Sequence, residues 1–536
     1  MSPRPSLLRS TLTFSGATFV SRILGLVREQ AIAYAFRVGT QTDAFWVAFR
    51  IPNLLRRLFA EGSFSVAFVP VFTEVKETRS HEDLKRLVAN TAGALGGVLL
   101  IVTALGVLCA GWVARGFAPG SIDEPAKLAL TTSMLRVTFP FILFVSLTAL
   151  AGGVLNSFDR FGLPALTPVI LNVCMIAGAL WLAPHLDTPI MALGWAIFAA
   201  GILQLLVQLP ALRSLDLLSL PRWGWNHPDL RRIMRLMVPT LFGSSVYQVN
   251  LLLDTLIASF LITGSQTWLA QSDRLFEFPL GIFGVALGTV ILPSLSRHHV
   301  STDREGFAKA LDWGLRTTLL IAIPAMLALV LLAKPILATL LLHGAYTPHD
   351  VDMAALSLSA LSFGLPAFAL VKVVAPAFYA RQDTKTPVRA AIAAMIANMV
   401  MNVVFVALLF SLWHTPAQDG AGWLDAIAKV PGLHMGLALA SALASYLNLA
   451  QLWIGLRRDG IYVRQPGWAA HLVRLGVSCA AMVAVIVACL VAWPDWSAWD
   501  AVTRIVRLGI VIAAAGGAFA AVLFATGFRL GELRAH

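Results

Sequence analysis

Charged side chains interrupt the first two apolar segments of this chain, where a bilayer-spanning helix normally carries few. The first segment carries Arg22, Arg28 and Glu29, and the second carries Asp43, Arg50, Arg56, Arg57 and Glu61. A charge at the centre of a bilayer costs about 2.5 to 3.5 kcal/mol even on a lenient insertion scale. These side chains must therefore face a water-filled cavity, one another or an anionic ligand, which makes them the first candidates for a functional site.

The spacing of these residues predicts shared helix faces. Residues seven apart lie on one face of a helix, so Asp43, Arg50 and Arg57 form a stripe that Asn53 and Glu61 join at three- and four-residue spacing. Arginine also occurs at a matching point in the second half of the chain. There a further apolar segment places three charged side chains on one face: Asp273, Arg274 and Glu277.

Two kinds of chemistry fit these charges. Arginine carries a fixed charge and a planar fork of donors that grips phosphate in bidentate fashion, so several arginines around a cavity would form a receptor for a diphosphate. The alternative is internal ion pairing, because the acids nearly balance the arginines. Both can hold together if the acids position the arginines.

An oxygen-rich site for a small cation is a second candidate. Asp254 lies in the middle of an apolar segment, and Asn398 and Asn402 lie one turn apart in another. Carboxylate and amide oxygens are ligands for hard cations. Asparagine in a membrane helix more often forms hydrogen bonds between helices, so this reading stays open beside the structural one.

A polar connection in the second half is the one place where an enzyme of the membrane could keep a metal or a catalytic acid. It contains His343, His349, Asp350 and Asp352. Their spacing matches no known ligand motif, and polar loops are common. The four cysteines form no CxxC pair, so they indicate neither a zinc site nor a disulfide framework.

Composition indicates a polytopic membrane protein. Apolar residues make up 58% of the chain and charged residues only 13%, whereas soluble domains are about 25% charged. The net charge of +12 would favour nucleic acid in a soluble protein, but here it lies mostly in short loops, so we expect no nucleic-acid partner. The apolar stretches predict fourteen spanning helices. They lie near 8–36, 41–74, 88–114, 128–156, 163–183, 189–211, 231–262, 266–295, 311–333, 352–380, 386–411, 434–456, 468–493 and 502–526.

The positive charges predict the orientation. If the N-terminus is cytoplasmic, the inner loops hold most lysines and arginines, as the positive-inside rule requires. The outer loops then hold little more than Arg37, Arg115, Lys127, Lys334 and Lys429. Both termini should therefore be cytoplasmic, which agrees with an even number of helices.

The chain also resembles itself at a shift of 223 to 225 residues. Gly39-Thr40-Gln41-Thr42 matches Gly264-Ser265-Gln266-Thr267, and Pro70, Phe139 and Pro164 match Pro293, Phe363 and Pro387. We expect two homologous six-helix lobes, 1–215 and 216–460, related by a pseudo-twofold axis along the membrane normal, with two further helices in 461–536. A substrate path would run between the lobes.

Several short stretches resemble one family over nearly the whole chain, the MurJ (MviN) lipid II flippases of the multidrug/oligosaccharidyl-lipid/polysaccharide exporter superfamily. They are Ser21-Arg22 with Gly25 and Arg28, Thr42-Asp43-Ala44-Phe45, Pro52-Asn53-Leu54-Leu55-Arg56-Arg57, Ala60-Glu61-Gly62, Asp273-Arg274-Leu275 with Glu277-Phe278-Pro279, and Arg381-Gln382-Asp383 with Lys385-Thr386-Pro387. The run from Pro52 to Gly62 is the most distinctive.

The resemblance implies a flippase that moves lipid II, an undecaprenyl-diphosphate-linked peptidoglycan precursor, across the bacterial inner membrane by alternating access. It implies substrate contacts at Arg22, Arg28, Asp43, Asn53, Arg56, Arg274 and Glu277, with Glu29, Arg50, Arg57, Glu61 and Asp273 in support. The last two helices would hold the lipid tail. Some members bind sodium at an acid of the seventh helix with partners in the eleventh, which Asp254, Asn398 and Asn402 resemble.

Rival functions remain at this stage. An exporter of another polyprenyl-linked glycan shares the diphosphate, and a drug exporter would favour an acidic cavity rather than arginines. The enzyme reading depends on the connection from His343 to Asp352. The chain has no Walker-type G-x-x-x-x-G-K-[ST] motif, so we expect no cofactor and a drive from Na+, H+ or the membrane potential. Cell-wall synthesis proteins are candidate partners beside lipid II and the bilayer.

Overall fold

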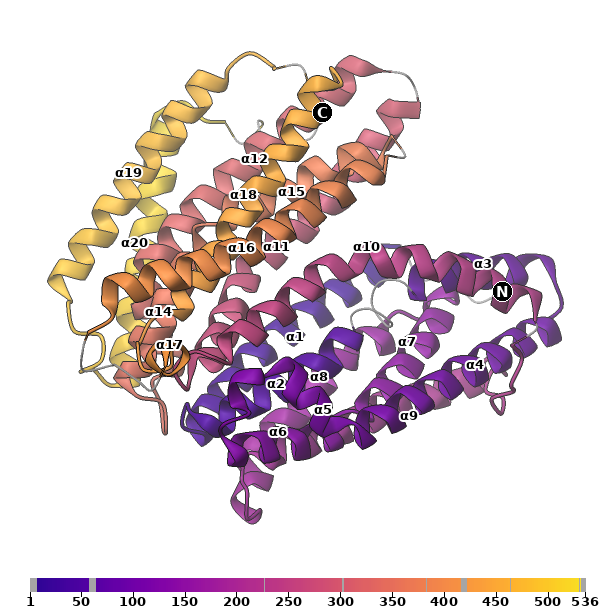
Figure 1. Ribbon diagram of the computed structural model, residues 1–536. Coiled ribbons are helices and arrows are strands. Elements are labelled where there is room, and N and C mark those ends of the chain that lie inside the picture. Colours follow the sequence, from indigo (N-terminus) through magenta and orange to yellow (C-terminus); the bar gives the residue numbers. More distant parts are fainter. Residues whose placement is uncertain are drawn as a thin grey trace. The chain divides into compact units, whose positions relative to one another are not determined.

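The computed structural model describes residues 7–56, 64–225, 227–300, 303–381, 383–415, 422–462, 464–529 and 531, and it gives the backbone alone at 7–19, 65–66, 238–247, 282–290, 292–293 and 296–300. The described residues form helices and short connections, with no strand among them (Figure 1). The all-α prediction is thus confirmed. The chain divides into two compact units, residues 1–266 and 267–536.

The first unit contains ten α-helices among its described residues. They are α1 (Leu7–Ala35), α2 (Thr40–Arg56), α3 (Phe64–Thr78), α4 (His81–Leu108), α5 (Ala110–Phe117), α6 (Pro125–Thr138), α7 (Phe141–Ser157), α8 (Gly162–Ala177), α9 (Met191–Ser214) and α10 (Pro228–Ala258). A buried cluster joins α3, α4, α7, α9 and the start of α10 around Phe64, Phe68 and Phe72. These aromatic rings bury large apolar areas and fix the helices against one another.

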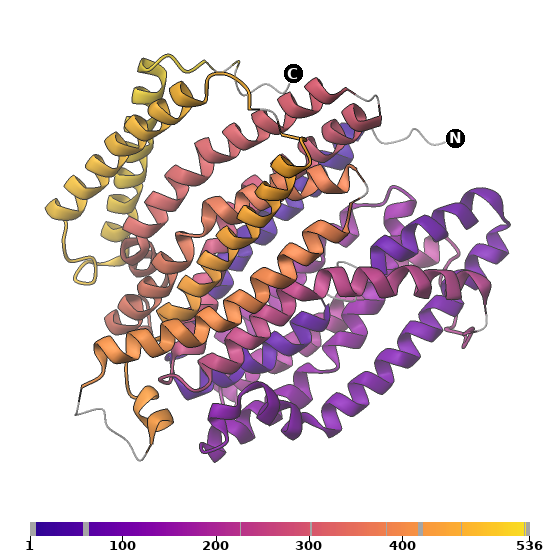
Figure 2. The same ribbon diagram turned by 45° about the horizontal axis from the view of Figure 1, so that its top comes forward.

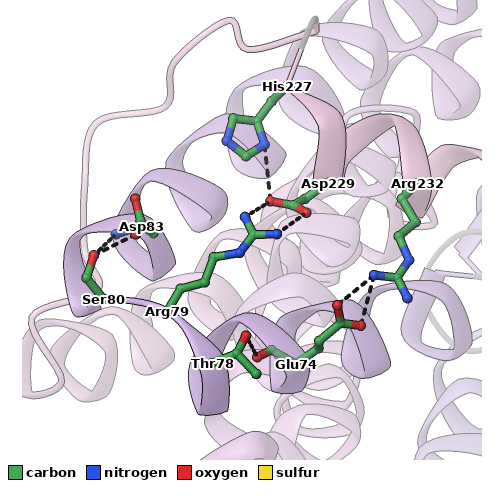
Figure 3. A network of polar contacts seen from close by, with 8 residues as sticks. All are labelled: Glu74, Thr78, Arg79, Ser80, Asp83, His227, Asp229 and Arg232. Atoms are coloured by element: carbon green, nitrogen blue, oxygen red, sulfur yellow. Dashed lines mark hydrogen bonds and ion pairs between the residues drawn. The ribbon is translucent and has the colours of Figure 1, made fainter.

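The start of α10 is tied to the end of α3 by ion pairs (Figure 3). Arg79 donates to both carboxylate oxygens of Asp229, at 2.7 and 3.1 Å. Arg232 pairs with Glu74, with 2.8 Å between Nη1 and Oε2. Asp229 is buried, so its bidentate contact with Arg79 is the stronger of the two. These contacts and the apolar cluster make α10 part of the first unit.

The second unit begins within α11 (Ser265–Val300). The helices that follow are α12 (Arg304–Leu331), α13 (Ala333–Leu341), α14 (Pro348–Ser362), α15 (Leu365–Tyr379), α16 (Lys385–Trp413), α17 (Trp423–Ile427), α18 (His434–Arg458), α19 (Trp468–Ala492) and α20 (Ala501–Ala525). Ile291 and Leu295 of α11 pack into an apolar core with α12, α15, α16 and α18.

The last two helices form a hairpin, with α19 and α20 side by side in both views (Figures 1 and 2). The connection before α19 is anchored to α12, because Tyr462 Oη and Trp468 Nε1 both donate to Asp312 Oδ1, at 3.0 and 2.6 Å. Arg316 Nε lies 2.7 Å from the other oxygen of this buried carboxylate. Burial, together with the bond to Asp312, raises the pKa of Tyr462 to about 12. The hairpin is therefore fixed to α12 at this end.

Ten helical stretches among the described residues are long and apolar enough to span a membrane. The predicted segments 8–36, 41–74, 231–262 and 266–295 also contain helices (α1, α2 with α3, α10, α11), but these are not among the ten. They are the segments that carry the candidate site's charges, and each of them includes residues that are undescribed or described by their backbone alone. A multi-pass membrane protein is confirmed, whereas fourteen spans and the lobe boundaries at 215 and 460 stay predictions.

Candidate functional site

Arg28 lies at the centre of a buried polar contact between α1 and α8. Its Nη1 donates to Asn172 Oδ1 at 3.0 Å, and its Nη2 pairs with the carboxylate of the neighbouring Glu29. Asn172 in turn donates to the carbonyl of Ser21 at 3.0 Å. Arg28 and Glu29 are 5% and 6% exposed. An acid and an amide thus hold the guanidinium in one orientation, beside the half-buried Arg22 one residue after Ser21.

Asp43 occupies the first turn of α2 and is almost completely buried, at 1% exposure. Its Oδ2 accepts a hydrogen bond of 2.7 Å from the backbone N–H of Gly264, which has a φ of +102°. The ammonium of Lys127 lies 3.7 Å from the same oxygen and is equally buried. Lys127 was predicted in an outer loop; instead it lies in the first turn of α6, which packs on α2.

Arg50 connects the same face of α2 to α10. Its Nη1 donates to Thr255 Oγ1 at 2.5 Å and approaches the carbonyl of Leu251 at 3.4 Å. Asp43 and Arg50 therefore both contact α10 or the turn that follows it, as their seven-residue spacing predicts for one helix face. Arg57 and Glu61, which the sequence placed on this stripe, lie outside the described residues.

Arg56 lies in the last turn of α2 beside Asn53. Its Nε and Nη2 both donate to Asn53 Oδ1, at 3.1 and 3.0 Å, and both side chains are half-buried. The amide oxygen of Asn53 orients the guanidinium plane. This arrangement suits a donor fork that receives an anion.

The charged face of the second unit lies on α11. Arg274 Nη1 is 3.6 Å from Glu277 Oε2, one turn along the helix, with side chains 28% and 37% exposed. Asp273 is half-buried next to them. At this distance and exposure the pair is weak, so Glu277 guides Arg274 rather than sequestering it.

The proposed cation ligands are divided between the two units. Asp254 is a half-buried residue of α10, whereas Asn398 and Asn402 are fully buried on α16. Among the described residues, no group of three or more His, Cys, Asp or Glu side chains could hold a metal ion. A sodium or proton site at these positions stays a prediction.

The connection from His343 to Asp352 has a structural explanation. Asp350 forms a capping box with Thr347 at the start of α14 and also accepts from Trp268 Nε1 at 3.1 Å. Burial, with a smaller effect of Asp350, raises the pKa of Tyr346 well above its usual value. Asp352 pairs with Lys334 at the surface. The buried acid is thus engaged in holding the helix N-terminus.

Within each unit, several cationic side chains of the candidate site lie beside an acidic one. Arg28 with Glu29, Lys127 with Asp43, and Arg274 with Glu277 join a cation to an acid. The sequence did not predict the roles of Asn172 and Thr255 or the burial of Lys127. For Asn172, the one available signal was an asparagine within an apolar segment. The predicted ion pairing is therefore present within each unit, and the diphosphate receptor stays a prediction.

Most of the helices are apolar, and the few that carry charge hold arginines in fixed orientations. This combination indicates a multi-pass α-helical membrane protein of the transporter class. The family model described as "Lipid II flippase MurJ" matches residues 32–507. The chain therefore belongs to the lipid II flippase MurJ family.

Relatives match over the full length. A protein of Vibrio cholerae serotype O1 named "Probable lipid II flippase MurJ" is 42% identical, covering 99% of this chain and 98% of the relative. The "Lipid II flippase MurJ" of Burkholderia cenocepacia is 41% identical, covering 99% of each. A solved structure, "Lipid II flippase MurJ, inward closed conformation", matches with a TM-score of 0.76 and 26% identity over 96% of this chain and 99% of that one.

A more distant structure shares the fold alone. An inward-facing multidrug resistance MATE family transporter of the MOP superfamily matches with a TM-score of 0.60 and 12% identity, over 84% of this chain and 98% of that one. This likeness confirms a transporter fold, and it carries no information about the transported molecule.

Proposed function

We propose that this protein is a lipid II flippase that carries the undecaprenyl-diphosphate-linked peptidoglycan precursor from the inner to the outer leaflet of the bacterial cytoplasmic membrane. The observation that carries the proposal is more than 40% identity, over practically the whole chain, with relatives of that name. The protein is a transporter, not an enzyme. Its partners are lipid II and the bilayer, and cell-wall synthesis proteins are further candidates.

The proposed substrate contacts are arginine forks that receive the diphosphate. A guanidinium offers two parallel N–H donors to a phosphate, and it keeps its charge at every physiological pH. Asn53 and Asn172 orient two of these forks by accepting one or two donors each. The assigned set is Arg22, Arg28, Asp43, Asn53, Arg56, Arg274 and Glu277, with Glu29, Arg50, Arg57, Glu61 and Asp273 in support.

The proposed architecture has fourteen spanning helices with both termini cytoplasmic. Two six-helix lobes related by a pseudo-twofold axis along the membrane normal would alternate access to the diphosphate site, and the hairpin of α19 and α20 would hold the lipid tail. Inner loops rich in lysine and arginine support this orientation. Na+, H+ or the membrane potential would supply the drive, with Asp254, Asn398 and Asn402 as the candidate cation ligands.

The proposal is tested by complementation in a bacterium whose own flippase is depleted and which has no redundant transporter. The chain is expected to restore lipid II exposure at the outer leaflet, measured by surface-specific labelling or cleavage. Arg56→Lys and Arg274→Lys should lower the exposure rate about tenfold, because lysine keeps the charge but loses the bidentate fork. If exposure fails to return at a normal level of folded protein, the substrate assignment is wrong.

Two alternatives make different predictions. An exporter of another polyprenyl-linked glycan would bind the same diphosphate, so selectivity has to be measured by offering both lipids to the purified protein. A drug exporter would not depend on the arginines.

An enzyme that uses the connection from His343 to Asp352 would lose activity in Asp350→Ala at normal folded level. We expect instead that Asp350→Ala lowers stability by about 1 to 2 kcal/mol, through loss of the capping box, and leaves transport per folded molecule unchanged. Thermal unfolding in detergent measures this change. Asp352→Ala, which removes only an exposed pair, is the matched control and should change neither quantity.

A further inference from the structure

The connection between α19 and α20, residues 493–500, concentrates aromatic rings at one end of the hairpin. It contains Trp493, Trp496 and Trp499 within seven residues. The two helices that it joins are among the apolar spanning segments. Tryptophan is enriched where a membrane protein crosses from hydrocarbon to headgroups. The connection therefore marks one membrane interface of the hairpin.

Arg507 of α20 is held against two of these rings. Its guanidinium carbon lies 3.7 Å from the ring centroid of Trp499 and 5.1 Å from that of Trp493. Trp499 is in turn supported by Trp496, which is 2% exposed and meets it edge to face at 5.3 Å. Cation–π contacts to an aromatic face leave the edge of the guanidinium, where all its N–H donors lie, open to a further ligand.

The acids of this region are engaged elsewhere. Asp500 caps α20 by accepting from the backbone of Val502 and Thr503, and Asp495 accepts from the backbone of Ser497. Across the described part of the chain, no carboxylate lies within 4 Å of the Arg507 guanidinium and no side chain or carbonyl accepts a hydrogen bond from it. A half-buried, aromatically clamped arginine thus keeps its donors available.

Arg504, one turn earlier, shows the structural use of an arginine on the same helix. Its Nη1 and Nη2 donate to the carbonyls of Ala338 and Leu342 at the end of α13, at 2.6 and 2.9 Å, and it is 5% exposed. Arg504 therefore fixes α20 to α13. Arg507, by contrast, packs on the rings of Trp493 and Trp499 with its face, so its N–H donors are available to another partner.

The surroundings of Arg507 identify the chemistry of that partner. Ile505, Val506 and Ile510 are 58%, 54% and 49% exposed on an apolar spanning helix, so this side of α20 faces lipid. Arg507 is the seventh residue of α20, about 9 Å along the helix from its start, a depth from which arginine reaches the headgroup layer. The anion available at that depth is a lipid phosphate.

We propose that Arg507, with Trp493 and Trp499, binds the phosphate of a membrane lipid at the outer end of the α19–α20 hairpin. The outer leaflet rests on the proposed orientation of the flippase, whereas the site itself rests on the local geometry. Two N–H groups of the guanidinium would donate to two phosphate oxygens, while the indole rings keep the guanidinium in one orientation. Phospholipid phosphate and polyprenyl diphosphate share this chemistry.

Native mass spectrometry of the full-length protein in detergent tests the proposal. The probes are phosphatidylglycerol, undecaprenyl diphosphate and inorganic phosphate, titrated separately. Arg507→Ala is expected to weaken binding of the first lipid molecule about tenfold, and Arg507→Lys less, because lysine keeps only the charge. Arg115→Ala is the matched control, since Arg115 lies over a single ring, Trp112, at 5.4 Å, and it should bind as the parent does.

Each outcome decides the proposal. The lipid that loses more affinity in Arg507→Ala identifies the source of the phosphate. Equal binding of both lipids by Arg507→Ala and the parent overturns the proposal and leaves the arginine as an interface anchor. If inorganic phosphate binds in an Arg507-dependent way but neither lipid does, the proposal is overturned too. Lipid II exposure, measured on the same variants, is a separate test. If the parent chain does not expose lipid II, only the flippase assignment is contradicted, and the lipid site is not.

Discussion

Replacing Arg28 with alanine is expected to abolish lipid II exposure and to leave a chain that cannot support growth as the sole flippase. The guanidinium holds Asn172 with one nitrogen and the buried Glu29 with another. Its removal deletes a fork that we propose to bind the diphosphate, and it takes the pairing cation from a carboxylate that is 6% exposed. Breaking a buried ion pair in this way costs about 3 to 5 kcal/mol, so the level of folded protein should fall as well.

A double variant separates the two effects of losing Arg28. Arg28→Ala with Glu29→Gln removes the charge that the single variant leaves behind, and we expect its thermal stability in detergent to recover most of the loss. Lipid II exposure should stay absent, because the fork that we propose for Arg28 is missing from the double variant as well. Recovery of exposure in the double variant would show that Arg28 serves only to neutralise Glu29.

Arg28→Lys is a finer control at the same position. Lysine supplies a cation for Glu29, but one ammonium cannot hold both Asn172 and the carboxylate in the planar arrangement of a guanidinium. We expect near-normal stability with exposure reduced about tenfold. Exposure equal to that of the parent would mean that charge alone suffices at this site.

The helices could be predicted because apolar length and charge decide where a chain crosses a membrane. Each predicted segment contains a helix, and the charged residues that violated the apolar pattern were the ones that led to the site. The family could be recognised for the same reason: stretches such as Pro52 to Gly62 keep polar residues at positions that hydropathy alone would not tolerate.

The partners of those charges could not be predicted, because they depend on tertiary contacts. Asn172 lies 144 residues from Arg28, and nothing in the spacing joins them. Lys127 follows Asp123, Glu124 and Pro125, a polar run that reads as an exposed loop. It is buried because α6 packs on α2 and brings it to Asp43. The sequence shows which charged residues are present, and the packing of the helices decides which of them form pairs.

The ion pairs and hydrogen bonds of the arginines agree with the proposal that they bind an anion inside the membrane. An arginine paired on one side is cheaper to bury than a bare one, and its planar fork retains donors for a second acceptor. Neutral acceptors also orient arginines, as Asn53 does for Arg56 and Thr255 for Arg50. In the proposed receptor, the acids and amides therefore set the direction in which each guanidinium points.

For the pair of Asp43 and Lys127 we expect a stability effect as large as that for Arg28. Asp43→Ala removes both the nearer carboxylate beside the buried Lys127 ammonium and the acceptor for the Gly264 N–H. The loss should reach about 3 to 5 kcal/mol, because the buried lysine loses its nearer carboxylate and keeps, among the described residues, only Glu124, which is partly exposed and 4.0 Å away. Thermal unfolding of the purified protein in detergent measures it, and the level of folded protein in membranes should fall in parallel.

Two neutral variants then assign the effect to charge or to the hydrogen bond. Asp43→Asn combined with Lys127→Met removes both charges while the amide oxygen can still accept from Gly264, so most of the stability should return. Asp43→Ala with Lys127→Met lacks that acceptor and should stay less stable, because a buried N–H at a backbone position with φ of +102° loses its partner. Equal stability of the two double variants would mean that the turn at Gly264 does not depend on Asp43. Asp43 would then act through Lys127 alone.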